Sequence, residues 1–329
     1  MPSPDRIMIP KPTIKTARPA KTLFPALIIT AMLSLVLFPV AAVALPDTLV
    51  KTFTVGARPW AGVMDSAGQN LYVTGASANA ISIINIATGA VTVNAIAVGN
   101  TPQGLALTPD GRYLYVANQG DNTVSKVDLT SRQVLKSIGV DAQPADVVIS
   151  KDGLTVFVSC YAGGTVSLIS TTTDTVSAGI VLNSGPWGLA LDPAGQYLYV
   201  AGSAANTVFK VRLVDLVVTV SGAVDGQPLY LAPSSDGTYV YVTCSIGGTV
   251  LKLSAADLTA NRAVNRAGAP FGRALTKDNN TLFVADTLAG SLKIVTTADM
   301  TITANQPTAG KGPAGVRLSP DGHCLLSMT

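Results

Sequence analysis

Both tryptophans of the 329-residue chain directly follow a proline, as Trp60 and Trp187, and Phe271 follows another. An indole or phenyl ring can stack on an aromatic, sugar or nucleotide ligand, or on an apolar side chain of a protein partner. Arg58 and Arg273 each lie two residues from one of these rings, and a guanidinium can pair with phosphate or carboxylate. These residue types at shared spacing predict a binding site.

Further polar and aromatic residues occur beside the other prolines or one loop later. We therefore expect the ligand-binding residues to be Trp60, Trp187, Phe271, Arg58, Arg273, Gln103, Tyr230, Asn118, Tyr161 and Asp146. Together they would form a shallow floor of rings and amides, suited to stacking and hydrogen bonding. The alternative is structural, with each ring after a proline filling the space between two adjacent repeating units. The residues alone leave both interpretations open.

The chain is poor in groups for acid–base catalysis. All 19 acidic residues are aspartates, and His323 is the one histidine. A Ser-His-Asp triad would have to use His323, and no G-x-S-x-G motif is present. One histidine also excludes clustered histidine ligands for zinc or haem, and a glycosidase-like pair of aspartates has no support. We therefore predict no catalytic residues, no metal ligands and no cofactor.

The candidate site residues belong to a unit that recurs from about residue 48 to the end of the chain. Within each copy, short alternating apolar stretches are separated by turn residues, which indicates strands. The best copy predicts strands at 105–107, 114–117, 123–127 and 133–140, with a hairpin turn at Asp110-Gly111. Four short antiparallel strands per repeat are typical of a β-propeller blade. A proline opens each copy, at Pro59, Pro102, Pro144, Pro186, Pro228, Pro270 and Pro313.

The phrases LYVAN, LYVTG and VYVTC, with PDG before and NTV after them, resemble the YVTN-repeat β-propellers, including the exported YncE-like group. The resemblance covers nearly all of residues 48–329. It implies a propeller in a surface-layer or periplasmic setting and brings no shared catalytic signature. It also raises a metal-dependent lactonase, but Asp146 is the only aspartate near the entry of a first strand, and a single acid is a poor site for a hard cation.

The predicted fold class is all-β, a seven-bladed β-propeller with an incomplete or three-stranded last blade closed by the N-terminal strand. Residues 48–55 are expected to be that strand. The last copy, from Pro313, stops at Thr329 before any third strand. The last blade is therefore either three-stranded or cut short, and in both cases it is expected to be the weakest.

Other repeated residues have structural explanations. The Asp-Gly pairs suit hairpin turns, which we prefer to calcium binding. Cys160 and Cys244 occupy the same repeat position two blades apart, too far for a disulfide, and are expected to be buried thiols. Six aromatic residues recur at strand spacing and are expected in the core between blades: Tyr72, Tyr115, Phe157, Tyr199, Tyr241 and Phe283.

The first 44 residues differ in kind from the repeats. Five basic residues precede an apolar run at 23–40 that ends in Ala42-Val43-Ala44, as in a secretory signal peptide. An uncleaved membrane anchor is the alternative. The expected domains are a signal peptide at 1–44 and a propeller at 45–329, located in the periplasm, outside the cell or on its surface. Without this segment the net charge of +3 becomes about −1, which does not favour nucleic acid as a partner.

The leading hypothesis is an exported, non-enzymatic binding scaffold that recognises a protein or surface polymer through its loop face. The first alternative is a periplasmic ligand or single-stranded nucleic-acid binder that uses an aromatic channel mouth. The second is a lactonase-like enzyme. A membrane partner is expected only if the signal segment stays uncleaved.

Overall fold

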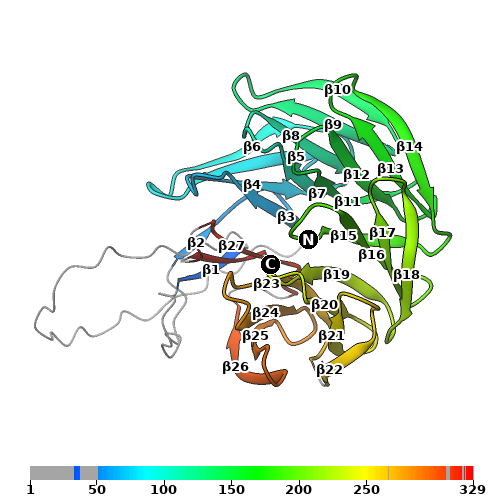
Figure 1. Ribbon diagram of the computed structural model, residues 1–329. Helices are drawn as coiled ribbons and strands as arrows, with labels where there is room; N and C mark the ends of the chain where they lie inside the picture. The colour runs from blue at the N-terminus through cyan, green and yellow to red at the C-terminus, as the bar shows by residue number, and fades with distance from the viewer. Residues whose placement is uncertain are drawn as a thin grey trace, which may run out of the picture.

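The computed structural model describes residues 33–37, 51–265, 267–308, 312–320, 322 and 324–328. All regular structure in these residues is β-strand. In the same residues, no helix could cross a membrane. The strands form antiparallel four-stranded sheets that radiate from a central axis (Figure 1).

Six sheets are blades, each made from one continuous stretch of chain: blade 1 (β3–β6), blade 2 (β7–β10), blade 3 (β11–β14), blade 4 (β15–β18), blade 5 (β19–β22) and blade 6 (β23–β26). The innermost strands are β3 (Pro59–Met64), β7 (Pro102–Leu107), β11 (Pro144–Ile149), β15 (Pro186–Leu191), β19 (Pro228–Pro233) and β23 (Pro270–Leu275). The second strands are β4 (Asn70–Gly75), β8 (Tyr113–Asn118), β12 (Thr155–Cys160), β16 (Tyr197–Gly202), β20 (Tyr239–Cys244) and β24 (Thr281–Asp286). The third strands are β5 (Ala80–Asn85), β9 (Thr123–Asp128), β13 (Thr165–Ser170), β17 (Thr207–Arg212), β21 (Thr249–Ser254) and β25 (Ser291–Thr296). The rim strands are β6 (Val91–Ala97), β10 (Gln133–Gly139), β14 (Thr175–Val181), β18 (Val217–Ala223), β22 (Ala260–Val264) and β26 (Thr301–Pro307).

The remaining sheet combines the two ends of the chain. Its order is β2 (Lys51–Phe53), β1 (Leu33–Leu37), β28 (Cys324–Met328) and β27 (Gly315–Leu318). We call it the closing sheet. It lies between blades 6 and 1, since β27 contacts both β23 and β3.

The predicted seven-bladed ring with an incomplete or three-stranded last blade is therefore wrong. The propeller has six blades of continuous chain, and the closing sheet has four strands, two from each end. The strand that the prediction missed is β1, which pairs with β28 in the register Leu33↔Met328 to Leu37↔Cys324. Leu and Val suit a strand as well as the apolar part of a signal peptide, so composition alone did not separate the two. The rest of the predicted signal peptide lies outside the described residues.

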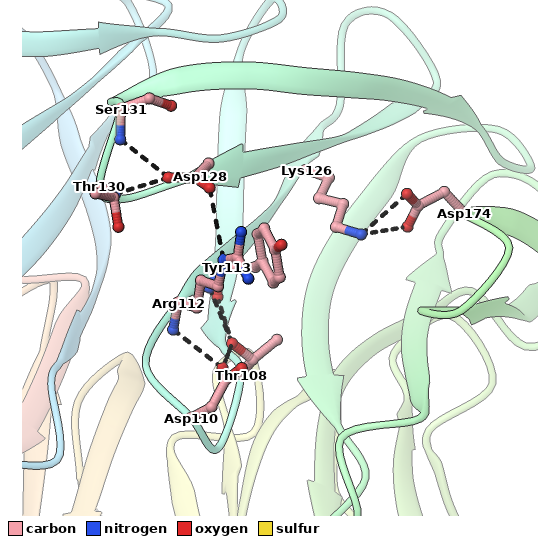
Figure 2. A network of polar contacts seen from close by, with 9 residues as sticks. All are labelled: Thr108, Asp110, Arg112, Tyr113, Lys126, Asp128, Thr130, Ser131 and Asp174. Carbon is pink, nitrogen blue, oxygen red and sulfur yellow. Dashed lines mark hydrogen bonds and ion pairs between the residues drawn. The ribbon is translucent and has the colours of Figure 1, made fainter.

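Turn chemistry explains the Asp-Gly pairs. Gly111 has a φ of 72°, which glycine adopts at little cost. The Asp110 carboxylate accepts hydrogen bonds from the Thr108 hydroxyl at 2.5 Å and from the Arg112 N–H at 3.0 Å (Figure 2). The carboxylate is thus used inside its own hairpin, as the turn interpretation predicts.

The loop from the second to the third strand also requires a left-handed residue. In each blade the residue before the third strand has a φ between 52° and 69°. Only asparagine or glycine occurs there, because these residues reach this conformation most easily. This requirement accounts for the Asn-Thr-Val and Gly-Thr-Val phrases; the residues are Asn79, Asn122, Gly164, Asn206, Gly248 and Gly290.

The core lies between neighbouring sheets. For example, Tyr115 of blade 2 packs with Val147, Val156 and Val158 of blade 3. The prediction of a recurrent aromatic core is confirmed, because all six residues are buried: Tyr72, Tyr115, Phe157, Tyr199, Tyr241 and Phe283. An ion pair joins the same two blades, between the Lys126 ammonium and the Asp174 carboxylate at 2.8 Å (Figure 2).

Both predicted buried thiols are confirmed. Cys160 and Cys244 are free and have no exposed surface. Burial raises the pKa of the Cys160 thiol and raises that of Cys244 to about 12. Neither is therefore a reactive thiolate at neutral pH.

Candidate functional site: the aromatic mouth and the channel pocket

One end of the propeller carries both the residues that open the first strands and the loops that follow the second strands. In blade 1 the Ala76 N–H donates to the Arg58 carbonyl at 2.9 Å, and in blade 3 the Tyr161 N–H donates to the Gln143 carbonyl at 2.9 Å. We call this end the mouth face. The sequence placed both sets of loops on one face, and these bonds agree with that placement.

Five aromatic rings meet at the mouth face. Trp60 contacts Phe271 edge-on at a centroid distance of 5.4 Å and lies 6.5 Å from Trp187. Tyr161 contacts Trp187 at 5.6 Å, and Tyr230 contacts Phe271 at 5.4 Å. We call this group the mouth cluster.

The mouth cluster spans the axis of the propeller. Trp60 belongs to blade 1 and Trp187 to blade 4, and these blades are not neighbours. The two indoles therefore meet across the channel, so their contact is not confined to the gap between two adjacent blades. Trp60, Trp187, Phe271 and Tyr161 are half-buried, so each keeps some surface for a ligand.

Hydroxyl groups of alternate blades donate to the inner strand of the next blade, and two of the three strands bonded in this way carry mouth-cluster rings. The Thr243 hydroxyl of blade 5 donates to the Phe271 carbonyl of blade 6 at 2.8 Å. The Ser159 hydroxyl of blade 3 donates in the same way to the Trp187 carbonyl of blade 4. Thr74 of blade 1 donates to the Gln103 carbonyl of blade 2 at 2.9 Å. The equivalent residues of blades 2, 4 and 6 are alanines: Ala117, Ala201 and Ala285.

A small cavity lies one residue deeper along the same inner strands. It has a volume of about 10 Å³, close to the space that one water molecule needs. Four side chains with polar groups line it, and we call it the channel pocket. The four are Asp146 of β11, Tyr230 of β19, Arg273 of β23 and Arg317 of β27.

Asp146 of the channel pocket is buried, and Arg273 and Arg317 are half-buried. The Asp146 carboxylate accepts hydrogen bonds from the Leu189 and Val147 N–H groups, both at 3.0 Å, yet burial raises its pKa. Burial, and then the nearby Arg317, lower the pKa of Arg273 to about 10. Burial, and then the Asp146 carboxylate, raise the pKa of Tyr230 to about 12. The pocket thus places two guanidinium groups beside a single carboxyl group, and an anion is the complementary ligand for this arrangement.

The remaining predicted site residues fall into two groups. Arg58 is exposed on the mouth face, with its guanidinium 5.7 Å from the Trp60 ring centroid. Gln103 is buried with 4% of its surface exposed, and Asn118 is fully buried. The Gln103 amide donates to Gln119, and the Asn118 amide donates to Thr123 and Ser125 inside blade 2.

Sequence reasoning missed Arg317. Four residues after the opening proline, the six blades have Val63, Ala106, Val148, Ala190, Ala232 or Ala274, and the closing sheet has Arg317. Comparing the copies position by position would have shown this change from a small apolar residue to a cation.

Two exposed aliphatic residues of the mouth face were also missed. Ile246 and Leu288 are 77% and 83% exposed, and they occupy the loops after the second strands of blades 5 and 6. They add exposed apolar surface to two loops of the mouth face. Their loop position gave no periodic signal in the sequence.

A second cavity opens at the other end of the propeller. It measures about 250 Å³ and lies between the hairpins of blades 2 and 3. The polar residues that line it include Asp110, Asp152 and Lys126, and those are already bonded within the fold. Within the residues that the structure covers, no group of three or more His, Cys or acidic residues is placed to hold a metal ion.

Comparison with known proteins supports the fold. Residues 67–181 match the Cytochrome D1 heme domain family. Hydrazine synthase of Kuenenia stuttgartiensis is 24% identical, with a TM-score of 0.71 over 86% of this chain and 95% of that chain. A functionally unknown protein from Desulfotomaculum acetoxidans DSM 771 is 16% identical, with a TM-score of 0.69 over 80% and 89%.

A third similar structure is the β-propeller domain of Myceliophteria thermophila Cps50 (Swd1), 11% identical, with a TM-score of 0.70 over 83% of this chain and 97% of that chain. A comparison with curated proteins gave no match. At these identities the likenesses show the β-propeller fold and no activity.

Proposed function

We propose that this protein is an exported, non-enzymatic propeller of the YVTN-repeat kind that binds a protein or surface polymer through its mouth face. The observation that carries the proposal is the meeting of half-buried rings from separate blades over the channel, on the face that also carries the exposed Ile246 and Leu288. The export part of the proposal rests on the predicted signal peptide.

An apolar partner segment fits this surface best. Aromatic side chains supply much of the binding energy in protein interfaces, particularly where the partner excludes water from them. Exposed aliphatic groups such as Ile246 and Leu288 gain when they are covered, by about 25 cal/mol per Å² of apolar surface. Arg58, at the edge of the rings, offers a charged contact at the rim.

Site-specific photo-crosslinking tests this proposal. A photoreactive amino acid at Leu288 should give a discrete product in the cell envelope of the source organism. Val214 is the matched control, since it is 88% exposed and follows a third strand at the opposite end of the propeller. We expect no product from position 214, and loss of the product from position 288 when Trp187→Ala is added. Equal products from both positions, or no effect of Trp187→Ala, would contradict the proposal.

A second candidate is a ligand or single-stranded nucleic-acid binder. The guanidinium of Arg58 beside the Trp60 ring favours it, because a base could stack on the ring while the cation meets a phosphate. Sub-micromolar affinity for an oligonucleotide, lost in Trp187→Ala, supports this function. Absence of binding at low salt excludes it.

A haem does not fit the described channel. The rings of the mouth cluster contact one another over the channel, and the pocket beneath them admits about one water-sized group. The one histidine, His323, lies outside the described residues. A divalent cation fits no better, because Asp146 is the only carboxylate lining the pocket and two guanidinium groups share it. We therefore propose neither a haem-dependent nor a lactonase-like activity.

A further inference from the structure

We propose that the channel pocket binds one carboxylate group, which enters between the rings of the mouth cluster. The inference rests on the proposed function only in using the mouth as the way in. It adds a chemical class of ligand that the aromatic surface alone does not specify.

The first argument is the balance of charge. The Asp146 carboxylate accepts hydrogen bonds from two backbone N–H groups. Arg273 donates through Nη2 to the Leu231 carbonyl, while its buried Nε has no partner among the described residues. Arg317 donates to the Gly62 and Val316 carbonyls, both at 3.1 Å. Two half-buried guanidinium groups therefore line the pocket with a single carboxyl group, and a cation partly withdrawn from water without a full counter-charge is costly.

The second argument is that the fold does not need these arginines. The position of Arg273, three residues after the opening proline, is Gly62 in blade 1 and aliphatic in the five other copies, as Leu105, Val147, Leu189, Leu231 and Val316. These five residues are buried and pack normally. The position of Arg317 is alanine in four blades, as noted above. Replacing two apolar residues by cations around one cavity lowers stability unless a ligand compensates the charge.

The third argument is the match of shape. A guanidinium donates two parallel hydrogen bonds to a carboxylate, and the Tyr230 hydroxyl can donate a third. The pocket admits a group of about the size of one water molecule, so one carboxylate oxygen fits while the rest of the ligand stays in the mouth. The mouth cluster then holds an apolar or aromatic body directly next to the carboxylate.

The two tryptophans make the test direct. Both belong to the mouth cluster, so their fluorescence reports on ligands that enter it. The probes are N-acetylphenylalanine and N-acetylphenylalaninamide, which differ in the carboxylate and share the aromatic body. We expect saturable binding of the acid, with the amide at least about tenfold weaker, since one charge-assisted pair contributes on the order of 1.4 kcal/mol or more.

Variants assign the effect to the pocket. Arg273→Leu restores the residue of the neighbouring blades, so we expect it to fold with an unchanged or higher Tm and to lose the preference for the acid. Asp146→Asn removes the competing carboxylate and should tighten binding of the acid several-fold. Arg317→Ala provides a second test at another position, also with the residue that other blades carry.

A peptide ending in Phe, with a free or an amidated C-terminus, distinguishes a partner's carboxylate from that of a small acid. Preference for the free peptide over N-acetylphenylalanine assigns the pocket to a chain end, and the reverse assigns it to a small carboxylic acid. Equal affinity for acid and amide, or an unchanged preference in Arg273→Leu and Arg317→Ala, overturns the inference. Neither result bears on partner binding, which the cross-link at Leu288 tests separately.

Discussion

Adjacent residues of one inner strand have different environments in this propeller. Phe271 lies in the mouth cluster, Gly272 and Arg273 line the channel pocket, and Ala274 is buried in the core beside the closing sheet. Gly272 has no room for a side chain, because an added Cβ would lie 2.2 Å from the Ala314 carbonyl oxygen of the closing sheet. A change of one residue along the strand therefore decides whether a side chain meets a ligand, a charge or the core.

The pH dependence of stability should reveal the buried carboxylate. Burial raises the pKa of Asp146 above its ordinary value of 3.8. Between that value and the raised pKa, the folded chain holds a proton that the unfolded chain has released. The free energy of unfolding should therefore fall as pH rises through this window.

Urea unfolding of the native chain and of Asp146→Asn, from about pH 4 to about pH 8, measures this effect. We expect the variant to lose part of the decline that the native chain shows. If the free energy of unfolding changes with pH in the same way for both proteins, Asp146 has the same pKa in the folded and the unfolded state.

Two glycines, Gly111 of a hairpin and Gly139 at the end of β10, give a second test at the residue scale. Gly111 has a φ of 72° and Gly139 does not have positive φ, while an added Cβ meets nothing within 4 Å at either position. Gly111→Ala should lower the free energy of unfolding by about 1–2 kcal/mol, because only the left-handed conformation opposes it. Gly139→Ala should be neutral or stabilising by up to about 1 kcal/mol. Thermal denaturation measures the stability of both variants. An equal change in stability in the two variants would show that the left-handed conformation of Gly111 is not the cause of the loss.

At the scale of elements, inner strands are tied to the preceding blade by side-chain hydroxyls. Thr243, Ser159 and Thr74 make this contact from blades 5, 3 and 1. Two of the three strands held in this way carry mouth-cluster rings. Further out, the Lys210 and Lys252 ammonium groups donate to carbonyls of the next blade, at 2.7 and 2.9 Å. The mouth cluster is therefore set by contacts between blades.

Thr243→Val tests this coupling. The hydroxyl is fully buried, donates to Phe271 and accepts from the Tyr230 N–H at 3.3 Å. Removing it should cost about 1–3 kcal/mol and shift the emission of the tryptophans through Phe271. Thr219→Val is the control, because its hydroxyl makes one exposed bond on the rim, and it should change stability by less than about 0.5 kcal/mol.

At the scale of the whole molecule, the closing sheet joins the two ends of the chain. One continuous core cluster includes Phe53 of β2 and the nearby Val55, Phe283 of blade 6, Leu71 of blade 1 and Met328 of β28. Since β1 lies between β2 and β28, its removal would leave an edge of β28 unpaired.

A chain that begins at Leu45, as signal-peptide cleavage would produce, lacks β1. We expect this chain to show a lower Tm than the full chain and faster hydrogen exchange in β28 than in β24, the equivalent strand of blade 6. Hydrogen exchange measured by mass spectrometry on both chains tests this. Unchanged protection of β28 would show that β2 can replace β1.

The repeat determined much of the structure in advance. Constant proline spacing, Asp-Gly hairpins and Asn or Gly before each third strand are local requirements of the backbone, so the blades and the common end of the loops followed from the sequence. The number of blades and the strands that make up the closing sheet could not be predicted from the sequence. Pairing between segments that are distant in the chain depends on which strand edge is left open.

The same division holds for the site. The sequence by itself placed Trp60, Trp187 and Phe271 at one repeated position, since a repeat transfers position from copy to copy. Only the tertiary structure decided that Trp60 and Trp187 meet across the axis, that Gln103 and Asn118 are buried, and that Arg317 joins Arg273 and Asp146 in one pocket. The physical reason is that closure of the ring brings inner strands of separate sheets together, and no spacing along the chain encodes those distances.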